Sequence, residues 1–310
     1  MQGYIMFKLM QSHVRISRCL LLAFICLTLL SLQAQATIST EKLIVSGASG
    51  QLGELTIKEL LRRGVQAKNL ILVSRRPEKL DQYAKLGASV RYGDLYKPES
   101  LPAAYAGGTR MLLISIDIVP GAVPRPQTHK VGFDAAVKAG VKHIVYTSFI
   151  GADTGTSWLA LDHRQSEENL KASGAKWTLL RNGFYADRVV QQAIEMVKTG
   201  RASVTPNEAK SAPVTREDCA AAAAGALLDP KFENMAFDIT GPALFGTEDI
   251  AAAASTITGK HIEVVEQSTA AAGMMTPAIA TNAVAELSGR PATGLRALLE
   301  ANKDKLIAAR

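Results

Sequence analysis

Short apolar runs alternate with longer amphipathic stretches along most of the chain between residues 42 and 199. The apolar runs predict strands near 42–46, 70–74, 88–92, 110–115, 142–147 and 176–181. The amphipathic stretches predict helices near 51–63, 77–86, 98–105, 127–139, 162–173 and 184–199. This alternation is typical of an α/β, Rossmann-like fold, in which a doubly wound parallel sheet carries helices on both faces.

The pattern becomes less regular beyond residue 200. Short strands are predicted at 235–239 and 261–265, and helices at 247–258 and 295–307. We expect a Rossmann domain over 37–200 and a small C-terminal substrate lobe over 201–310 that covers the carboxyl edge of the sheet. Residues 267–287 are rich in Ala, Thr, Met and Gly without a clear period, and we expect this segment to be mobile.

The first 36 residues differ in composition from the rest of the chain. Lys8, Arg15 and Arg18 precede the apolar run 19–32, which is followed by Ala34-Gln35-Ala36. A basic region, an apolar region and a small-x-small cleavage site together predict a signal peptide over 1–36. The chain is therefore expected to be exported to the periplasm without a stable membrane span after cleavage. An uncleaved membrane anchor and a cytoplasmic location are the alternatives.

The net charge of +7 over 310 residues raises the question of nucleic acid as a partner. The basic residues are scattered, and aromatic residues make up only 5% of the chain, so neither a basic stripe nor a base-stacking platform is predicted. After removal of the signal peptide only Cys219 remains, which predicts a buried helical residue without a disulfide. The histidines show no paired spacing, and we expect no metal site.

A glycine-spaced turn follows the first predicted strand directly and precedes a predicted helix. It reads Gly47-Ala48-Ser49-Gly50-Gln51-Leu52-Gly53. A turn of this kind presents the free N–H groups and the positive dipole end of the helix to a pyrophosphate. Glycine allows the sharp turn, the close approach of the phosphates and the tight packing of helix on strand. The context of strand, turn and helix therefore predicts a dinucleotide site.

The second predicted strand indicates which dinucleotide the site binds. NAD-preferring sites place a carboxylate at this point, against the ribose 2′-hydroxyl. This strand instead ends in Ser74-Arg75-Arg76-Pro77 without an acid. Because guanidinium groups bind a 2′-phosphate well, Arg75 and Arg76 predict NADPH as the cofactor. The alternative is that both arginines are merely solvated.

Further motifs occur in a characteristic order along the chain. They are Gly93-Asp94-Leu95, Leu112-Leu113-Ile114-Ser115, the run 139–148 that ends in Tyr146-Thr147-Ser148, and Leu179-Leu180-Arg181-Asn182-Gly183-Phe184-Tyr185. Together with the glycine turn, they resemble the NmrA-like atypical short-chain dehydrogenase/reductase family and, within it, the bacterial NADPH-dependent quinone oxidoreductases.

The resemblance implies a role for each motif. The turn Gly47–Leu52 would bind the pyrophosphate, Arg75 the 2′-phosphate, and Asp94 with Leu95 the adenine edge. Ser115 would contact the ribose on the nicotinamide side. Tyr146 would lie at the end of the fifth strand, where the nicotinamide is expected, and Arg181 would belong to the loop beside it. Ordinary core packing is the alternative for these last two residues.

Typical short-chain dehydrogenases use a Tyr-x-x-x-Lys pair, in which the tyrosine is the proton donor. The resemblance places Leu159 and His163 at these two positions, so the pair is missing. Reduction of a quinone needs less catalytic assistance from side chains than reduction of a ketone, since the cofactor performs the difficult chemistry. The sequence thus predicts hydride transfer from NADPH to a quinone or a similar electron-poor carbonyl, with His163, Ser148 and Tyr185 as candidate proton donors. A non-catalytic NADP-binding sensor is the alternative, and a homodimer is expected.

Overall fold

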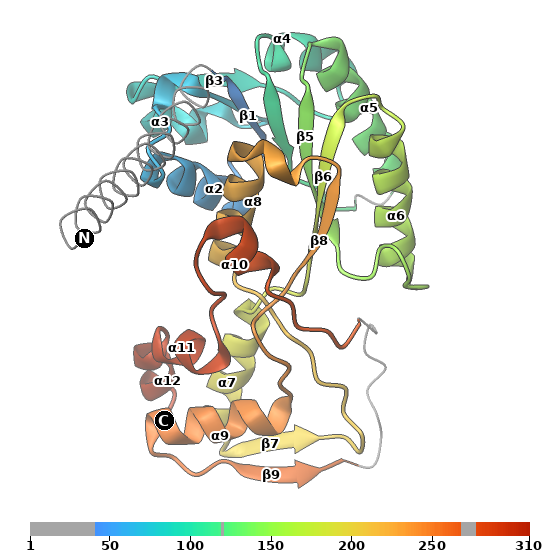
Figure 1. Cartoon of the computed structure of the whole chain (residues 1–310). Helices are drawn as coiled ribbons and strands as arrows, with labels where there is room; N and C mark the ends of the chain where they lie inside the picture. The colour runs from blue at the N-terminus through green and yellow to red at the C-terminus, as the bar shows by residue number, and fades with distance from the viewer. Residues whose placement is uncertain (1–40, 119–120, 268–276) are drawn as a thin grey trace, which may run out of the picture. The chain divides into compact units, whose positions relative to one another are not determined.

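The computed structural model describes residues 41–118, 121–267 and 277–310, so the predicted signal peptide lies outside the described residues. Its centre is a parallel seven-stranded sheet with the order β3-β2-β1-β4-β5-β6-β8 (Figure 1). The strands are β1 (Leu43–Ser46), β2 (Leu70–Ser74), β3 (Ser89–Tyr92), β4 (Arg110–Leu113), β5 (His143–Phe149), β6 (Lys176–Asn182) and β8 (Met235–Ile239). The strand order reverses between β1 and β4, which is where ligands bind in sheets of this kind. The predicted α/β Rossmann-like fold is confirmed.

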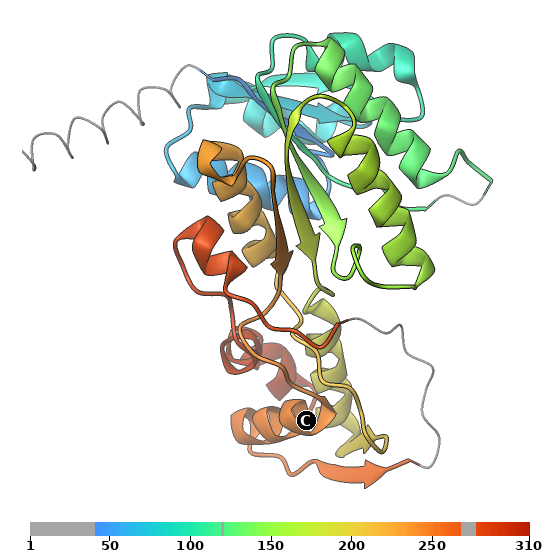
Figure 2. The same ribbon diagram turned by 45° about the vertical axis from the view of Figure 1, so that its right-hand side comes forward.

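Helices cover both faces of the sheet (Figures 1 and 2). One face carries α2 (Gln51–Arg62), α8 (Arg216–Leu228) and α10 (Ala283–Ser288), and the other carries α4 (Leu101–Tyr105), α5 (Arg125–Lys138) and α6 (Trp158–Lys171). The short helix α3 (Asp81–Lys85) lies beside β3. Each layer has its own hydrophobic core, with Ile57 and Leu227 in the first and Phe133 and Leu170 in the second.

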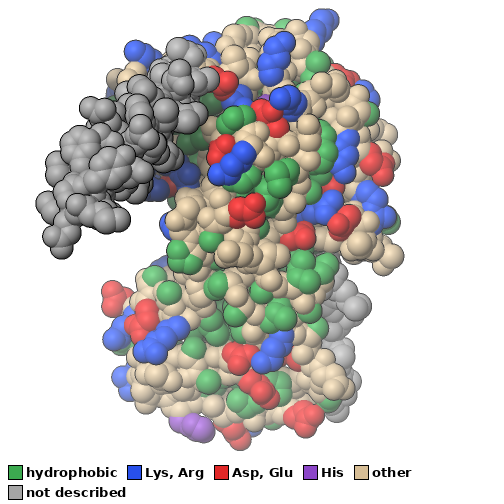
Figure 3. All heavy atoms as spheres, viewed as in Figure 1, with side chains coloured by type: hydrophobic (Ala, Val, Ile, Leu, Met, Phe, Trp, Pro, Cys, Tyr) green, Lys and Arg blue, Asp and Glu red, His purple; other side chains and the backbone are tan. Residues whose placement is uncertain are grey.

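The remaining elements form a smaller lobe. It contains the parallel pair β7 (Arg201–Val204) and β9 (Glu263–Glu266), with α7 (Asp187–Thr199), α9 (Thr247–Thr258), α11 (Leu295–Glu300) and α12 (Lys303–Ala308). A separate core that includes Val197, Ile250 and Leu306 holds it together. The lobe lies beyond the carboxyl ends of β6 and β8 (Figure 2). On the face shown in Figure 3, basic and acidic side chains are interspersed.

Three expectations for the C-terminal part were wrong. The predicted strand at 235–239 belongs to the main sheet, where β8 pairs with β6, and not to the lobe. Ala283–Ser288 is an ordered helix because Val284 and Leu287 are buried against α8. The single helix predicted at 295–307 is broken in two at Asn302, whose side chain bonds the Leu298 carbonyl oxygen at 2.9 Å and so competes with the backbone.

Two further expectations concern specific segments. Cys219 is buried in α8, as predicted. The residues 268–276, which formed part of the segment expected to be mobile, lie outside the described residues. Within the described ranges, no helix combines the length and the apolar character that a membrane span requires.

Candidate functional site

The glycine turn lies at the carboxyl end of β1 and leads into α2. Gly47 has a φ of +90°, and the N–H groups of Gly47 and Ala48 donate to the carbonyl oxygen of Val73 on β2, each at 3.1 Å. Gly50 is the N-cap of α2, and no side chain caps the helix there. The first N–H groups of α2 are therefore available to an anion.

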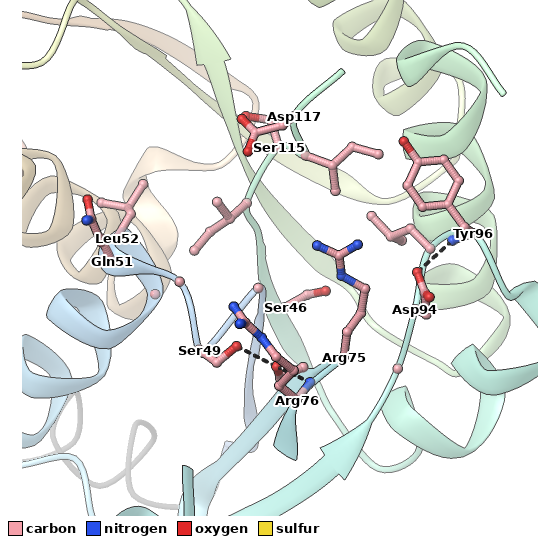
Figure 4. Close-up of a pocket in the computed structure, with 18 of the residues that line it drawn as sticks. Ser46, Ser49, Gln51, Leu52, Arg75, Arg76, Asp94, Tyr96, Ser115 and Asp117 are labelled. Carbon is pink, nitrogen blue, oxygen red and sulfur yellow. Dashed lines mark hydrogen bonds between the residues drawn. The ribbon is translucent and has the colours of Figure 1, made fainter. Parts of the chain in front are cut away.

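The turn forms one wall of a cavity of about 410 Å³ at the point where the strand order reverses (Figure 4). Its lining includes almost every residue that the sequence assigned to the cofactor: Gly47, Ser49, Gly50, Gln51, Leu52, Gly53, Arg75, Arg76, Asp94 and Ser115. Ala48 is fully buried and contributes its backbone to the turn. We call this cavity the dinucleotide pocket.

The two arginines project from the end of β2, and both are exposed. Their guanidinium groups reach into the pocket in Figure 4. Ser74 fixes the preceding backbone, because its hydroxyl oxygen accepts from Arg76 N at 2.9 Å and bonds Ser49 Oγ at 2.6 Å. A pair of cations beside a row of free N–H groups suits a ligand with several phosphates.

The residues of the pocket that were not identified from the sequence include Tyr96, Ile116, Asp117 and Arg216. Arg216 comes from the first turn of α8 and packs its guanidinium 4.1 Å from the ring centre of Tyr185. It also pairs with Asp187 of α7. Thr215 and Asp218 are a recognisable helix start, in which Thr215 Oγ1 accepts from Asp218 N at 3.1 Å. Nothing in the local sequence, however, indicates that this helix lies beside the glycine turn.

A second cavity, of about 330 Å³, adjoins the first and shares Ser115 and Asp117 with it. We call it the second pocket. Its walls are largely aromatic and apolar, with Phe149, Trp158, Leu159 and Phe184 among them. The three candidate proton donors His163, Ser148 and Tyr185 all line it. Leu159 and His163, which the resemblance places at the positions of the Tyr-x-x-x-Lys pair, both line this pocket.

The Ser148 hydroxyl donates to Glu167 Oε1 at 2.6 Å, at the end of β5. Arg181 holds the same carboxylate through Nε at 2.9 Å and Nη2 at 2.8 Å, and also pairs with Asp153. The hydrogen bonds to Glu167 raise the pKa of Arg181. This buried ion pair uses the guanidinium of Arg181, and the residue lines neither pocket, so the geometry favours the alternative of core packing over the expected cofactor contact.

Tyr146 also lies away from the dinucleotide pocket. It is 0% exposed, and its hydroxyl lies 3.0 Å from Nδ1 of both His129 and His163. Burial raises its pKa. The Tyr146 side chain points into the layer of α5 and α6, so core packing is favoured over the expected cofactor contact here as well.

Tyr185 is half-buried and lines the second pocket. Burial raises the pKa of Tyr185 to about 12, so its hydroxyl keeps its proton near neutral pH. His163 is only 4% exposed, and burial lowers its pKa to about 2, so its imidazole is neutral. The second pocket consequently offers these neutral hydrogen-bonding groups, together with Asp117 and Arg125, beside an aromatic wall.

Comparison with known proteins agrees with this geometry. A family model described as NAD(P)H-binding matches residues 47–230. Quinone oxidoreductase 2 of Escherichia coli (strain K12) is 34% identical over 218 residues, which cover 70% of this chain and 75% of that protein. NAD(P)H azoreductase of Xenophilus azovorans is 29% identical over 228 residues, or 72% and 76% of the two chains.

Solved structures show the same likeness. The crystal structure of the NADPH-dependent quinone oxidoreductase of Escherichia coli complexed with NADPH superposes with a TM-score of 0.74 at 28% identity, over 84% of this chain and 99% of that chain. The triphenylmethane reductase of Citrobacter sp. complexed with NADP(H) gives a TM-score of 0.73 at 28% identity, over 87% and 100%.

Proposed function

Because the chain belongs to the NAD(P)H-binding family, we propose that it is an NADPH-dependent reductase that transfers a hydride to a quinone or a similar electron-poor carbonyl. The predicted resemblance to the NmrA-like reductases is confirmed by the same comparisons. Two of the relatives are named as a quinone oxidoreductase and an azoreductase, which supports a quinone or a similar acceptor as the substrate.

The dinucleotide pocket fits NADPH on its own chemistry. A Cβ at Gly53 would lie 2.4 Å from Gly47 O, so glycine is what allows the start of α2 to pack this closely on the turn. The N–H groups of Gln51 to Gly53 would bind the pyrophosphate, and Arg75 with Arg76 would bind the 2′-phosphate. When bound there, NADPH supplies the hydride.

The observation that carries the proposed activity is the second pocket. It adjoins the dinucleotide pocket through Ser115 and Asp117, and its aromatic wall suits a flat ring stacked beside the nicotinamide. It has neither a tyrosine nor a lysine at the positions that ketone reduction uses. A quinone is reduced readily once the two rings are aligned, so alignment is the main task of this pocket.

The activity is tested by following NADPH absorbance with a panel of benzoquinones, naphthoquinones and azo dyes. We expect steady oxidation of NADPH with at least one class of quinone. Tight NADPH binding without oxidation by any acceptor would instead support the non-catalytic sensor.

The cofactor preference is tested with the double variant Arg75→Ala/Arg76→Ala. Loss of two charge-assisted contacts should weaken NADPH binding by about 10²-fold and leave NADH binding nearly unchanged. The matched control is Lys79→Ala/Lys85→Ala, which removes the same charge from exposed positions outside the pocket. An unchanged ratio of NADPH to NADH affinity in the arginine variant would contradict the assignment.

We further propose export of the chain, on the composition of residues 1–36. N-terminal sequencing of the protein purified from separated cell fractions tests it. A mature N-terminus at Thr37 in an exported fraction is expected, and intact Met1 in the cytosol would refute the proposal.

A further inference from the structure

A buried polar cluster lies behind the second pocket and takes no part in the dinucleotide pocket. It contains His129 on α5, Tyr146 on β5, and His163 and Ser166 on α6. His129, Tyr146 and Ser166 are each 0% exposed. The Tyr146 hydroxyl lies between the two imidazoles, 3.0 Å from each Nδ1. Such a cluster is stable only if every proton has an acceptor.

A backbone hydrogen bond determines which nitrogen of His129 carries the ring proton. The N–H group of Ile116 donates to His129 Nε2 at 3.1 Å, and a backbone N–H can only donate. Burial lowers the pKa of His129 to about 3, so the ring is neutral and its one proton lies on Nδ1. That proton is accepted by Ser166 Oγ at 3.0 Å, whose own hydroxyl donates to Asp162 O, also at 3.0 Å.

The position of the Tyr146 hydroxyl proton follows from the tautomer of His129. Since His129 Nδ1 carries a proton, it cannot accept from Tyr146. Of the two imidazole nitrogens that lie 3.0 Å from the Tyr146 hydroxyl, His163 Nδ1 is the one that can accept its proton. A buried hydroxyl without an acceptor would cost about 1–3 kcal/mol. Tyr146 therefore donates to His163 Nδ1, and the single proton of the neutral His163 ring lies on Nε2.

His163 Nε2 has no hydrogen-bond partner among the residues that the structure describes. Nε2 is not enclosed by the protein, and the ring lines the second pocket. The atom is therefore accessible from that pocket. Phe149 stacks on the imidazole with ring centres 6.0 Å apart and helps to hold its orientation. The N–H bond is thus fixed in direction before any substrate arrives.

We propose that Nε2–H of His163 is the hydrogen-bond donor that binds a carbonyl oxygen of the substrate in the second pocket, and that Tyr146 and His129 are positioning residues that fix its tautomer. The inference rests on the proposed reduction of a quinone at this site. It assigns to His163 a donor role in place of the proton-donor role considered from the sequence.

In the balanced reaction, the quinone gains the hydride of NADPH and one proton from solvent and becomes a hydroquinone, while NADP⁺ is released. Negative charge gathers on the carbonyl oxygen as the hydride arrives. A donor preset at that oxygen binds it more strongly in the transition state than in the ground state. His163 keeps its own proton throughout, since the neutral imidazole is a hydrogen-bond donor here and not an acid.

The tautomer is tested in the protein without cofactor by ¹⁵N-edited NMR of histidine-labelled enzyme. The His163 signals are assigned by their loss in a His163 variant. We expect the pattern of a neutral ring protonated at Nε2 throughout pH 6 to 8. Tyr146→Phe should lose this fixed pattern, whereas Tyr83→Phe should keep it, because Tyr83 is a buried tyrosine on α3 whose hydroxyl has no partner. A ring protonated at Nδ1, or an imidazolium at pH 6, would overturn the inference.

The role in turnover is tested by comparing His163→Gln with His163→Asn. The longer amide places an N–H group near the position of Nε2, and the shorter one near that of Nδ1. We expect the asparagine variant to lose about 10²-fold in kcat for quinones with little change in KM. The glutamine variant should retain kcat within about tenfold.

The two proposals fail in distinguishable ways. If the native enzyme oxidises NADPH with no quinone, the proposed function fails, while the NMR measurement still decides the tautomer. If the native enzyme is active and folded His163→Asn keeps the full kcat, the donor role is refuted and the reductase assignment stands. Thermal unfolding of each variant shows that it is folded.

Discussion

At the scale of single residues, Gly53 shows how tightly the turn is packed. A Cβ there would approach Gly47 O to 2.4 Å and Ala48 Cα to 2.9 Å, both of them backbone atoms that cannot move aside cheaply. Gly53→Ala should therefore displace α2 from the turn, weaken NADPH binding at least tenfold, and destabilise the fold by about 1–3 kcal/mol. Titration with NADPH and urea unfolding measure the two effects.

Gly294→Ala is the control for this substitution. A Cβ at Gly294 would meet only a Pro242 side-chain carbon at 3.7 Å, and its φ of −80° is accessible to alanine. The control should bind NADPH normally. Equal NADPH affinities in the two variants would show that the close approach at Gly53 is not needed for NADPH binding.

Two of the expected cofactor residues, Tyr146 and Arg181, line neither pocket, and for the same reason. Tyr146 and Arg181 lie on strands that end at the site, and a sequence motif indicates only this position along the strand. Whether a side chain reaches a ligand depends on the face to which it points and on what packs there. Tyr146 contacts His129 and His163, and Arg181 contacts Glu167, and all three partners come from the neighbouring helices α5 and α6.

At the scale of elements, α8 packs unusually closely against its neighbours. Residues Asp218 to Leu227 are all buried, and most of them are alanine. A Cβ at Gly225 would lie 1.8 Å from the Leu287 carbonyl oxygen of α10, so the two helices touch through their backbones. The hydrophobic period could not reveal this contact, because a helix of small residues has no distinct polar face.

Gly225→Ala tests this contact. We expect α10 to be pushed off α8 at a cost of about 1–3 kcal/mol, measured as a lower midpoint of urea unfolding. An unchanged midpoint would mean that α10 contributes nothing to the stability of the sheet layer.

At the scale of the whole molecule, three buried histidines link stability to pH. Burial lowers the pKa of His129 and His143 to about 3 and that of His163 to about 2. Below an unfolded pKa of about 6.5 the unfolded chain therefore binds protons that the folded protein does not. Stability should fall as the pH drops from about 6.5 towards 3, by at most about 1.4 kcal/mol per pH unit for each histidine.

Urea unfolding at a series of pH values measures this dependence. The free energy of unfolding should be nearly constant between pH 7 and 8 and decline steadily below about 6.5. A free energy that stays constant down to pH 5 would show that these rings are protonated in the folded protein as well.

The sequence alone determined the order of strands and helices up to β6, the glycine turn and the arginine pair that follows β2. These features are local, because each depends on only a few neighbouring residues. They are an apolar period, a turn that needs glycine, and a charge at a strand end. The tertiary structure decided the rest. It placed β8 in the main sheet and Arg216 in the dinucleotide pocket, joined that pocket to the second one, and enclosed His129, Tyr146 and His163 in one cluster. Those contacts join residues distant along the chain, and their geometry depends on how the layers pack.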